Sequence, residues 1–169
     1  MTEQLDFGWV YDLNPLATFR MVTRLERLTE EAGHLDHKQH SILELREREG
    51  LFRYVVQRQF DPTATARGPR FFGSKPAMLK LTQIWQPSNW DGTRKYDTVG
   101  EISGMPVQIA GSGAVTPIGA GGTRYSVSLT VTSSTRKVET AVAESLSRTV
   151  QAEHAFRVTW LQRQSHSGF

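Results

Sequence analysis

The feature that most limits the fold is the stretch from Arg136 to Gln162, which contains neither proline nor glycine. It is rich in Ala, Glu, Leu and Arg, residues of high helix propensity, so it predicts one long helix. At about 100° per residue, apolar side chains share one broad face and polar ones the opposite face. The apolar set is Val138, Val142, Leu146, Val150, Phe156 and Trp160, and the polar set is Glu144, Arg148, Gln151 and Gln162. One side of this helix is therefore expected to be buried.

Before this helix, the hydrophobic pattern is mostly that of β-strands. Apolar residues alternate from Glu3 to Tyr11, which is the period of a strand with one buried face. Asn14 followed by Pro15 predicts a helix start, and helical spacing continues to Gly33, so we expect one helix here or two shorter ones. Further strands are predicted at Ser41 to Glu47, Leu51 to Phe60, Met78 to Gln86, Thr93 to Ser103, Pro106 to Thr116 and Arg124 to Thr132.

One connection is longer than the others. Between Asp61 and Ala77, prolines and glycines interrupt any regular pattern, which predicts a long ordered loop with at most one short helix. Phe71 and Phe72 give this loop apolar groups to bury, either as a flap over one end of a cavity or as part of the core. The basic residues near them are too thinly spaced to indicate a nucleic-acid surface. These residues are Arg67, Arg70, Lys75 and Lys80.

The order of strand, helix, about six strands and long helix indicates an α+β fold. Glu49-Gly50 predicts a hairpin turn, and turn residues join the last four strands into an antiparallel meander. A sheet with one half-solvated face needs the long helix to cover the other face. We therefore expect a curved antiparallel sheet of about six to seven strands wrapped around the C-terminal helix, in one domain spanning residues 1–169.

Composition excludes several classes of site. Cysteine is absent, which rules out disulfides, thiolate metal sites and cysteine nucleophiles, and makes a cytoplasmic protein the default expectation. The N-terminal residues lack the pattern of a signal peptide, and no run of 18 apolar residues predicts a transmembrane segment. The net charge of +3 arises from 20 basic and 17 acidic residues that are interspersed along the chain. We therefore expect no nucleic-acid partner, and a monomer or homodimer.

The second half of the chain carries a more specific pattern. Its parts are, in order, a strand ending in Trp85, an Asp91-Gly92 turn, Val99-Gly100, a Gly104-Met105-Pro106 break, Gly111-Ser112-Gly113, Val138-Glu139, Ala152-Glu153-His154-Ala155-Phe156 and Trp160-Leu161. Together they resemble DUF2505, a bacterial family within the START-like or polyketide cyclase (SRPBCC) superfamily. The resemblance implies a helix-grip fold with an apolar cavity between the sheet and the long helix. It implies no catalytic residue and no cofactor.

Glu153 is the candidate for acid–base chemistry, although the sequence assigns no catalytic residue. It lies near the centre of the apolar face of the long helix, where a carboxylate is partly desolvated, as in a general acid or base. The alternative is structural, with Glu153 in an ion pair with Arg157 one turn later or in a hydrogen bond to Tyr54 or Tyr96 on the sheet.

Two other patterns suggest sites but do not meet their requirements. His34, His37 and His40 lie near an acidic residue, as zinc ligands do, but their spacing spreads them over roughly 120° of a helix. The glycines between Gly104 and Gly122 match neither the dinucleotide fingerprint nor a P-loop. We therefore expect no metal site and no phosphate-binding loop.

The middle of the long helix predicts a cavity. Its buried face carries Ser145, Thr149 and Ala152 where a tightly packed interface would have Leu or Ile. Buried polar groups need partners, so space for a ligand or water is expected there. The residues predicted to bind the ligand are Trp9, Tyr54, Trp85, Tyr96, Thr149, Glu153 and Phe156.

Three functions are open on these grounds. The first is binding of a hydrophobic small molecule, such as a lipid, an isoprenoid or a polyketide-like compound, which needs only the cavity. The second is a cyclase, dehydratase or lyase in which Glu153 acts as acid or base and a tyrosine polarises a carbonyl. The third is a structural or interaction protein whose cavity is filled by its own side chains and which associates through a sheet edge or outer face.

Overall fold

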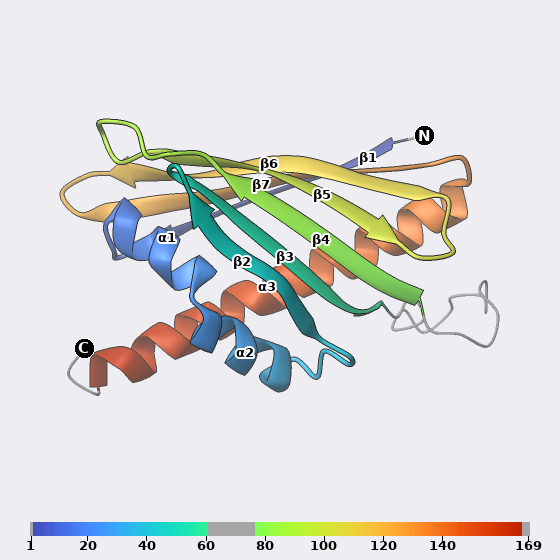
Figure 1. Ribbon diagram of the computed structural model, residues 1–169, viewed down its shortest axis with the longest axis horizontal. Helices are drawn as coiled ribbons and strands as arrows, with labels where there is room; N and C mark the ends of the chain where they lie inside the picture. The colour runs from blue at the N-terminus through green and yellow to red at the C-terminus, as the bar shows by residue number, and fades with distance from the viewer. Residues whose placement is uncertain (1, 61–76, 167–169) are drawn as a thin grey trace.

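The computed structural model describes residues 2–60 and 77–166, within which three helices cover one face of a seven-stranded sheet (Figure 1). The elements are, in order, β1 (Thr2–Tyr11), α1 (Pro15–Thr23), α2 (Leu25–His34), β2 (Ser41–Arg48), β3 (Leu51–Phe60), β4 (Ala77–Trp85), β5 (Arg94–Ile102), β6 (Val107–Ile118), β7 (Gly122–Ser133) and α3 (Arg136–His166). The loop predicted between Asp61 and Ala77, with Phe71 and Phe72, lies outside the described residues except for Ala77, which begins β4.

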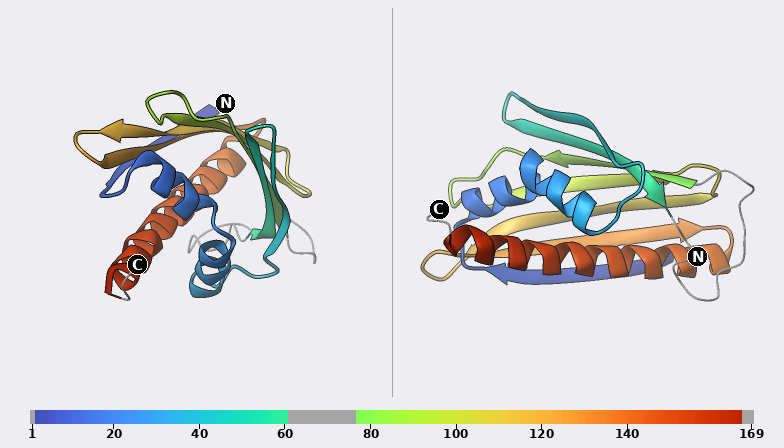
Figure 2. Two further views of the ribbon diagram at one scale, coloured as in Figure 1. Left: turned by 60° about the vertical axis from the view of Figure 1, so that its left-hand side comes forward. Right: turned by 90° about the horizontal axis from the view of Figure 1, so that it is seen from below.

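Every strand pairing is antiparallel, and the strand order is β1-β7-β6-β5-β4-β3-β2. The first strand therefore lies beside the last, with Leu5 opposite Leu129 and Trp9 opposite Tyr125. Figure 2 shows that the sheet is curved and that the helices lie on its concave side. The α+β fold expected from the sequence, a curved antiparallel sheet that grips a C-terminal helix, is confirmed.

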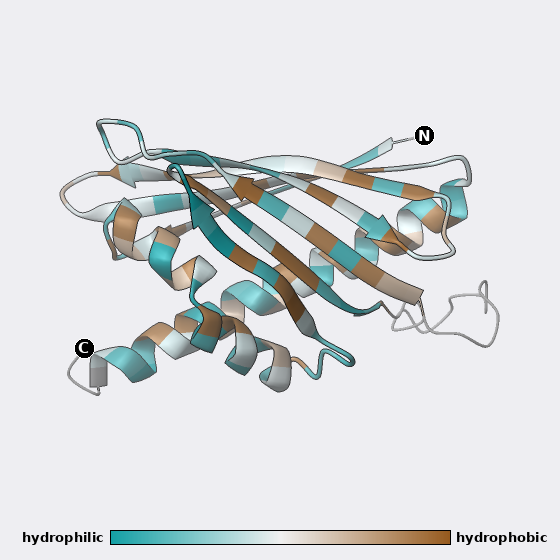
Figure 3. Ribbon diagram, in the orientation of Figure 1, coloured by the Kyte–Doolittle hydropathy of each residue, from teal (hydrophilic) through white to brown (hydrophobic). Residues whose placement is uncertain are grey.

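Local sequence explains the sheet. Hydrophobic and hydrophilic residues alternate along several of its strands (Figure 3). In β5 buried and exposed residues alternate strictly, although the buried positions include Arg94 and the exposed ones Val99. Glu49 and Gly50 have φ angles of 54° and 79°, the positive values that a tight hairpin turn requires, and they join β2 to β3. At Gly113 of β6, an added Cβ atom would overlap the Tyr96 ring, so this glycine permits close packing inside the sheet.

The helical region before β2 forms two helices, one of the two outcomes expected from the sequence. The Asn14 side chain accepts a hydrogen bond of 2.8 Å from the backbone N–H of Ala17 and so begins α1. Arg24 is extended and separates α1 from α2. The break lets the fully buried Arg27 turn back and donate hydrogen bonds to the carbonyl oxygens of Met21 and Val22 at the end of α1. Arg27 thereby satisfies carbonyl groups that a helix end leaves without partners.

Helix α3 packs two apolar clusters against the sheet. Toward its N-terminus, Val138, Val142 and Leu146 belong to one cluster, and toward its C-terminus, Phe156 and Trp160 belong to the other. The predicted buried face of the helix is therefore confirmed, and the helix continues past Gln162 to His166. The residues between the two clusters are smaller, and they define the region described next.

Candidate functional site

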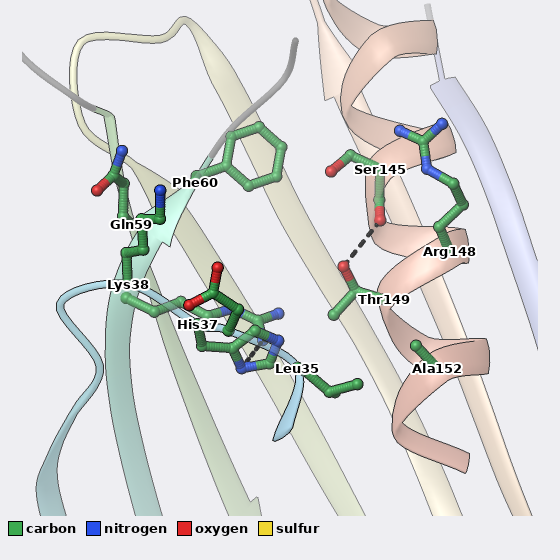
Figure 4. A pocket seen from close by; sticks show the side chains of 11 residues that line it. Leu35, His37, Lys38, Gln59, Phe60, Ser145, Arg148, Thr149 and Ala152 are labelled. Carbon is green, nitrogen blue, oxygen red and sulfur yellow. Dashed lines mark hydrogen bonds between the residues drawn. The ribbon is translucent and has the colours of Figure 1, made fainter. Parts of the chain in front are cut away.

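A pocket of about 440 Å³ lies along the middle of α3, opposite the end of β3 and the segment that joins α2 to β2. Figure 4 shows the small side chains of α3 on one side of this pocket, with Phe60 and His37 on the other. Its lining consists of Leu35, Asp36, His37, Lys38, Arg58, Gln59, Phe60, Ser145, Arg148, Thr149 and Ala152. The volume is in the range of sites that hold small organic molecules.

The helix wall of the pocket is made of small residues. Ser145 is buried, while Thr149 and Ala152 are half-buried. The Thr149 hydroxyl donates a hydrogen bond of 3.0 Å to the carbonyl oxygen of Ser145, so the helix itself satisfies this polar group. The pocket is open because Ser145, Thr149 and Ala152 place no large apolar side chain in it.

Arg58 brings positive charge to the pocket from the sheet. Its place in β3, two positions from Phe60 and from Val56, sets it on the inner face, where it is only 8% exposed. Its Nη1 atom lies 2.9 Å from both ring nitrogens of His37 and 3.4 Å from Oε1 of Glu153. Arg58 therefore connects β3, the segment after α2 and α3 at one point.

From Arg58, a chain of ion pairs continues beneath the pocket. Oε2 of Glu153 lies 3.8 Å from Nη2 of Arg157, and Nε of Arg157 lies 3.9 Å from Oε2 of Glu31. Glu31 also accepts a hydrogen bond from the guanidinium of Arg27. The structural interpretation of Glu153, an ion pair with Arg157 one turn later, is confirmed. The chain joins α2, α3 and β3 through buried arginines and Glu31, while the Glu153 side chain is 21% exposed.

Burial changes the acid–base behaviour of the groups around this chain. Burial raises the pKa of Tyr54, and the nearby carboxylates of Glu153 and Glu31 raise it further, so its phenol stays a neutral hydrogen-bond donor. For Arg157, burial opposes the charged form, but Glu31, Tyr125 and Glu153 outweigh it and raise the pKa above its usual value. Arg157 is therefore charged at any pH at which the protein is folded.

Residues 8–161, most of the chain, match the model of a family described as a protein of unknown function, DUF2505. The chain belongs to the DUF2505 family. This agrees with the resemblance seen in the second half of the sequence, where the strand that ends in Trp85 and the end of the long helix carry the pattern. Among curated proteins, none matches the sequence of this DUF2505 protein.

Solved structures of low sequence identity share the fold of the DUF2505 protein. The Zhui aromatase/cyclase from Streptomyces sp. R1128 is 11% identical, with a TM-score of 0.58 over 98% of this chain and 96% of that chain. The human StarD13 lipid transfer and protein localization domain is 14% identical, with a TM-score of 0.55 over 91% of this chain and 74% of that chain. A START superfamily protein from Mycobacterium smegmatis is 13% identical, with a TM-score of 0.54 over 94% of this chain and 98% of that chain.

These likenesses concern the fold. The expected START-like, or SRPBCC, helix-grip architecture is confirmed by them. In the part of the chain that the structure describes, no helix is both long enough and apolar enough to cross a membrane.

Four residues that the sequence predicted to bind ligand lie in the aromatic core of the DUF2505 protein, outside the pocket lining. Trp85 and Tyr96 are 0% and 1% exposed, and their ring centroids are 4.4 Å apart. Trp9 stacks on His154 with ring centroids 4.5 Å apart, and Phe156 is buried beside them. These aromatic side chains fill the space between the sheet and the C-terminal part of α3.

The other three predicted residues lie at or near the pocket. Thr149 lines it directly. Glu153 does not line it but contacts Arg58, which does. Tyr54 is half-buried on β3 and lies close enough to Glu153 and Arg58 for their charges to act on its pKa.

Sequence reasoning missed two residues that give the pocket its polar end, Arg58 and His37. The signal for Arg58 was present, because the alternation of β3 places it on the same face as Phe60. The histidine spacing argues against a zinc site, but it does not indicate that His37 lies at a pocket. In the structure the histidines separate, with His34 beside the Phe156 ring and His37 beside Arg58. Within residues 2–60 and 77–166, no group of three or more His, Asp or Glu side chains is placed to hold a metal ion.

The stability of the protein is expected to fall between pH 7 and pH 5 because of His37. Burial and the adjacent Arg58 lower the pKa of His37 from 6.5 to about 4, and His40 adds to this, while Glu153 and Asp36 oppose it. In that pH window the unfolded chain binds a proton at His37 that the folded chain does not, so the free energy of unfolding decreases as the pH falls.

Urea unfolding at both pH values tests this expectation in the wild type and in the His37→Gln variant. The variant should show a weaker dependence on pH, because the proton uptake of the unfolded state at this position is removed. An identical dependence in both proteins would show that His37 titrates in the same way whether the chain is folded or not.

Proposed function

We propose that this protein binds an apolar small molecule, such as a lipid, an isoprenoid or a polyketide-like compound, in the pocket between α3 and β3. The observation that carries the proposal is the gap between the two apolar clusters on α3, where Ser145, Thr149 and Ala152 leave about 440 Å³ open. The carbon atoms of Leu35 and Phe60 on the opposite wall give such a ligand apolar contacts.

The neighbours in fold support the same class of function. One is named an aromatase/cyclase and another a lipid transfer and protein localization domain, and the second name refers to an apolar class of ligand. Because these chains share only 11% and 14% identity with this one, they support the class of ligand and leave its identity to experiment.

Fluorescence titration with N-phenyl-1-naphthylamine, an uncharged apolar probe, tests the proposal. The probe should bind at about one per chain. Ser145→Leu and Ala152→Leu should each weaken binding at least tenfold, because the larger side chain occupies the space that the probe uses. Ala155→Leu is the matched control, since Ala155 is exposed on the same helix and does not line the pocket.

Two outcomes would contradict the proposal. One is the absence of saturable probe binding to the wild type. The other is unfolding of both Leu variants while the Ala155→Leu control stays folded, which would mean that the middle of α3 is already close-packed. Circular dichroism and urea unfolding of each variant separate loss of binding from loss of structure.

The enzymatic alternative, with Glu153 as acid or base and Tyr54 polarising a carbonyl, has weaker support. Glu153 lies between two arginines, Arg58 and Arg157, and these pairs hold its carboxylate in place. A carboxylate fixed in this way is suited to organising the polar end of a binding site.

A further inference from the structure

At the polar end of the pocket, the charges of the ion-pair chain do not balance, and its arginines are buried. The chain of ion pairs from Arg58 through Glu153, Arg157 and Glu31 to Arg27 contains three guanidinium groups and two carboxylates. All three arginines are at most 8% exposed. Buried charges are normally compensated, because an uncompensated charge inside a protein is costly. Among the side chains that form this chain, one positive charge has no counterpart.

The positive charge that lacks a counterpart lies at the end of the chain that borders the pocket, on Arg58. Glu153 divides its carboxylate between two arginines at 3.4 and 3.8 Å, longer than the 2.7–2.9 Å that is typical of charge-assisted hydrogen bonds. Arg27, at the other end, has Glu31 and two carbonyl oxygens as acceptors. Arg58 borders the pocket itself, and among the described residues its recorded partners are Glu153 and the ring of His37.

We propose that the ligand of this pocket is an amphipathic monocarboxylate whose carboxylate binds Arg58. The inference rests on the proposed function, since it assumes that the pocket takes an apolar molecule. The ligand's carboxylate accepts hydrogen bonds from the Arg58 guanidinium and supplies the one negative charge that the buried chain lacks. Its apolar body lies between Phe60 and Ala152, which line the same pocket.

The other charged side chains of the lining do not change this count. Lys38 and Asp36 are both exposed and of opposite sign, so solvent screens them and their charges cancel. Arg148 is exposed and also borders a separate surface pocket with Glu3 and Leu5. Of the charged side chains that the structure describes in this lining, only Arg58 is buried, and burial is where a charge is worth most in binding.

The test compares 1-pyrenebutyric acid with its methyl ester, which have the same aromatic body and differ in charge. At about pH 8 the acid is ionised, and it should bind the wild type at least tenfold more tightly than the ester, as one charge-assisted hydrogen bond in a buried site provides. Equal affinity of the acid and the ester would overturn the carboxylate proposal and leave the proposed function standing. Failure of the acid and the ester to bind a protein that does bind N-phenyl-1-naphthylamine would overturn the carboxylate proposal alone, and failure of all three probes would overturn both proposals.

Two variants of the ion-pair chain should change the ratio of acid to ester affinity in opposite directions. Arg58→Gln should reduce the ratio of acid to ester affinity to near one. Glu153→Gln should raise that ratio, because it removes the internal carboxylate that competes for Arg58. Arg53→Gln is the matched control on the outer face of the same strand, where Arg53 pairs with Glu44, and it should leave the ratio unchanged.

Ester affinity reports on the integrity of the pocket in every variant. If Arg58→Gln fails to fold, Glu153→Gln still decides the matter, because general damage would weaken the acid and the ester alike. A Glu153→Gln variant that binds the ester normally but shows no gain, or a loss, in preference for the acid would overturn the proposal.

Discussion

Replacing Trp160 by alanine is expected to lower the free energy of unfolding by about 3–5 kcal/mol, the usual cost of truncating a large buried aromatic residue. Trp160 is 4% exposed in the last turns of α3, where it belongs to the aromatic cluster with Phe156, Trp85 and Tyr96. Its loss leaves a cavity that the surrounding rings, held by the sheet, fill only in part. Urea unfolding of the purified variant measures the cost.

Trp160→Phe is the control that separates lost volume from lost polar contact. Within the described ranges, Nε1 of Trp160 is buried without a hydrogen-bond partner, so phenylalanine removes an unsatisfied group while it keeps most of the ring. We expect this variant to lose less than half of what Trp160→Ala loses. A loss below about 1 kcal/mol in Trp160→Ala would mean that the end of α3 is frayed in solution.

The long helix and the sheet were predictable because each depends on a repeating pattern. The 3.6-residue repeat of α3 and the alternation in β1 and β5 each appear many times, so a single irregular residue does not hide them. The break between α1 and α2 at Arg24 was harder to predict from the sequence. It depends on Arg27 reaching the carbonyl oxygens at the end of α1, a contact that the helical repeat does not encode.

The pocket was predictable in part. The small residues Ser145, Thr149 and Ala152 stood out in the sequence as a gap in the apolar face of the helix, and they form its wall. The opposite wall was not predictable, because it depends on which turn of α3 the end of β3 faces. Arg58 and Glu153 are 95 positions apart, and only the packing of the sheet on the helix brings them together.

The aromatic residues show where alternation stops being informative. It correctly indicates that Trp9, Trp85 and Tyr96 point to one face of the sheet, but not whether that face is open or filled at each point. In the structure their rings pack on one another and on His154, so the C-terminal part of the grip is closed. Open space remains where α3 carries small side chains and β3 ends.

Arg157→Met is expected to lower the free energy of unfolding by about 3–5 kcal/mol, the cost of removing one partner from a buried ion pair. Arg157 is 7% exposed and lies between Glu31 and Glu153, at 3.9 and 3.8 Å. Without it, Glu31 keeps only Arg27 as a cationic partner, and Glu153 keeps only Arg58. Burial and the charge of Glu153 raise the pKa of Glu31, and removal of Arg157 takes away a charge that lowers it, so the loss should be larger at pH 8 than at pH 5.

The surface pair of Arg53 and Glu44 provides the matched comparison. Its separation of 2.9 Å is shorter, but its side chains are 48% and 34% exposed, so Arg53→Met should cost less than about 1 kcal/mol. Adding Glu31→Gln to Arg157→Met should increase the loss, because it leaves the fully buried Arg27 without a carboxylate partner. A double variant as stable as Arg157→Met would show instead that the apolar packing of Arg157, whose guanidinium carbon lies 5.4 Å from the centre of the Tyr125 ring, determines the cost.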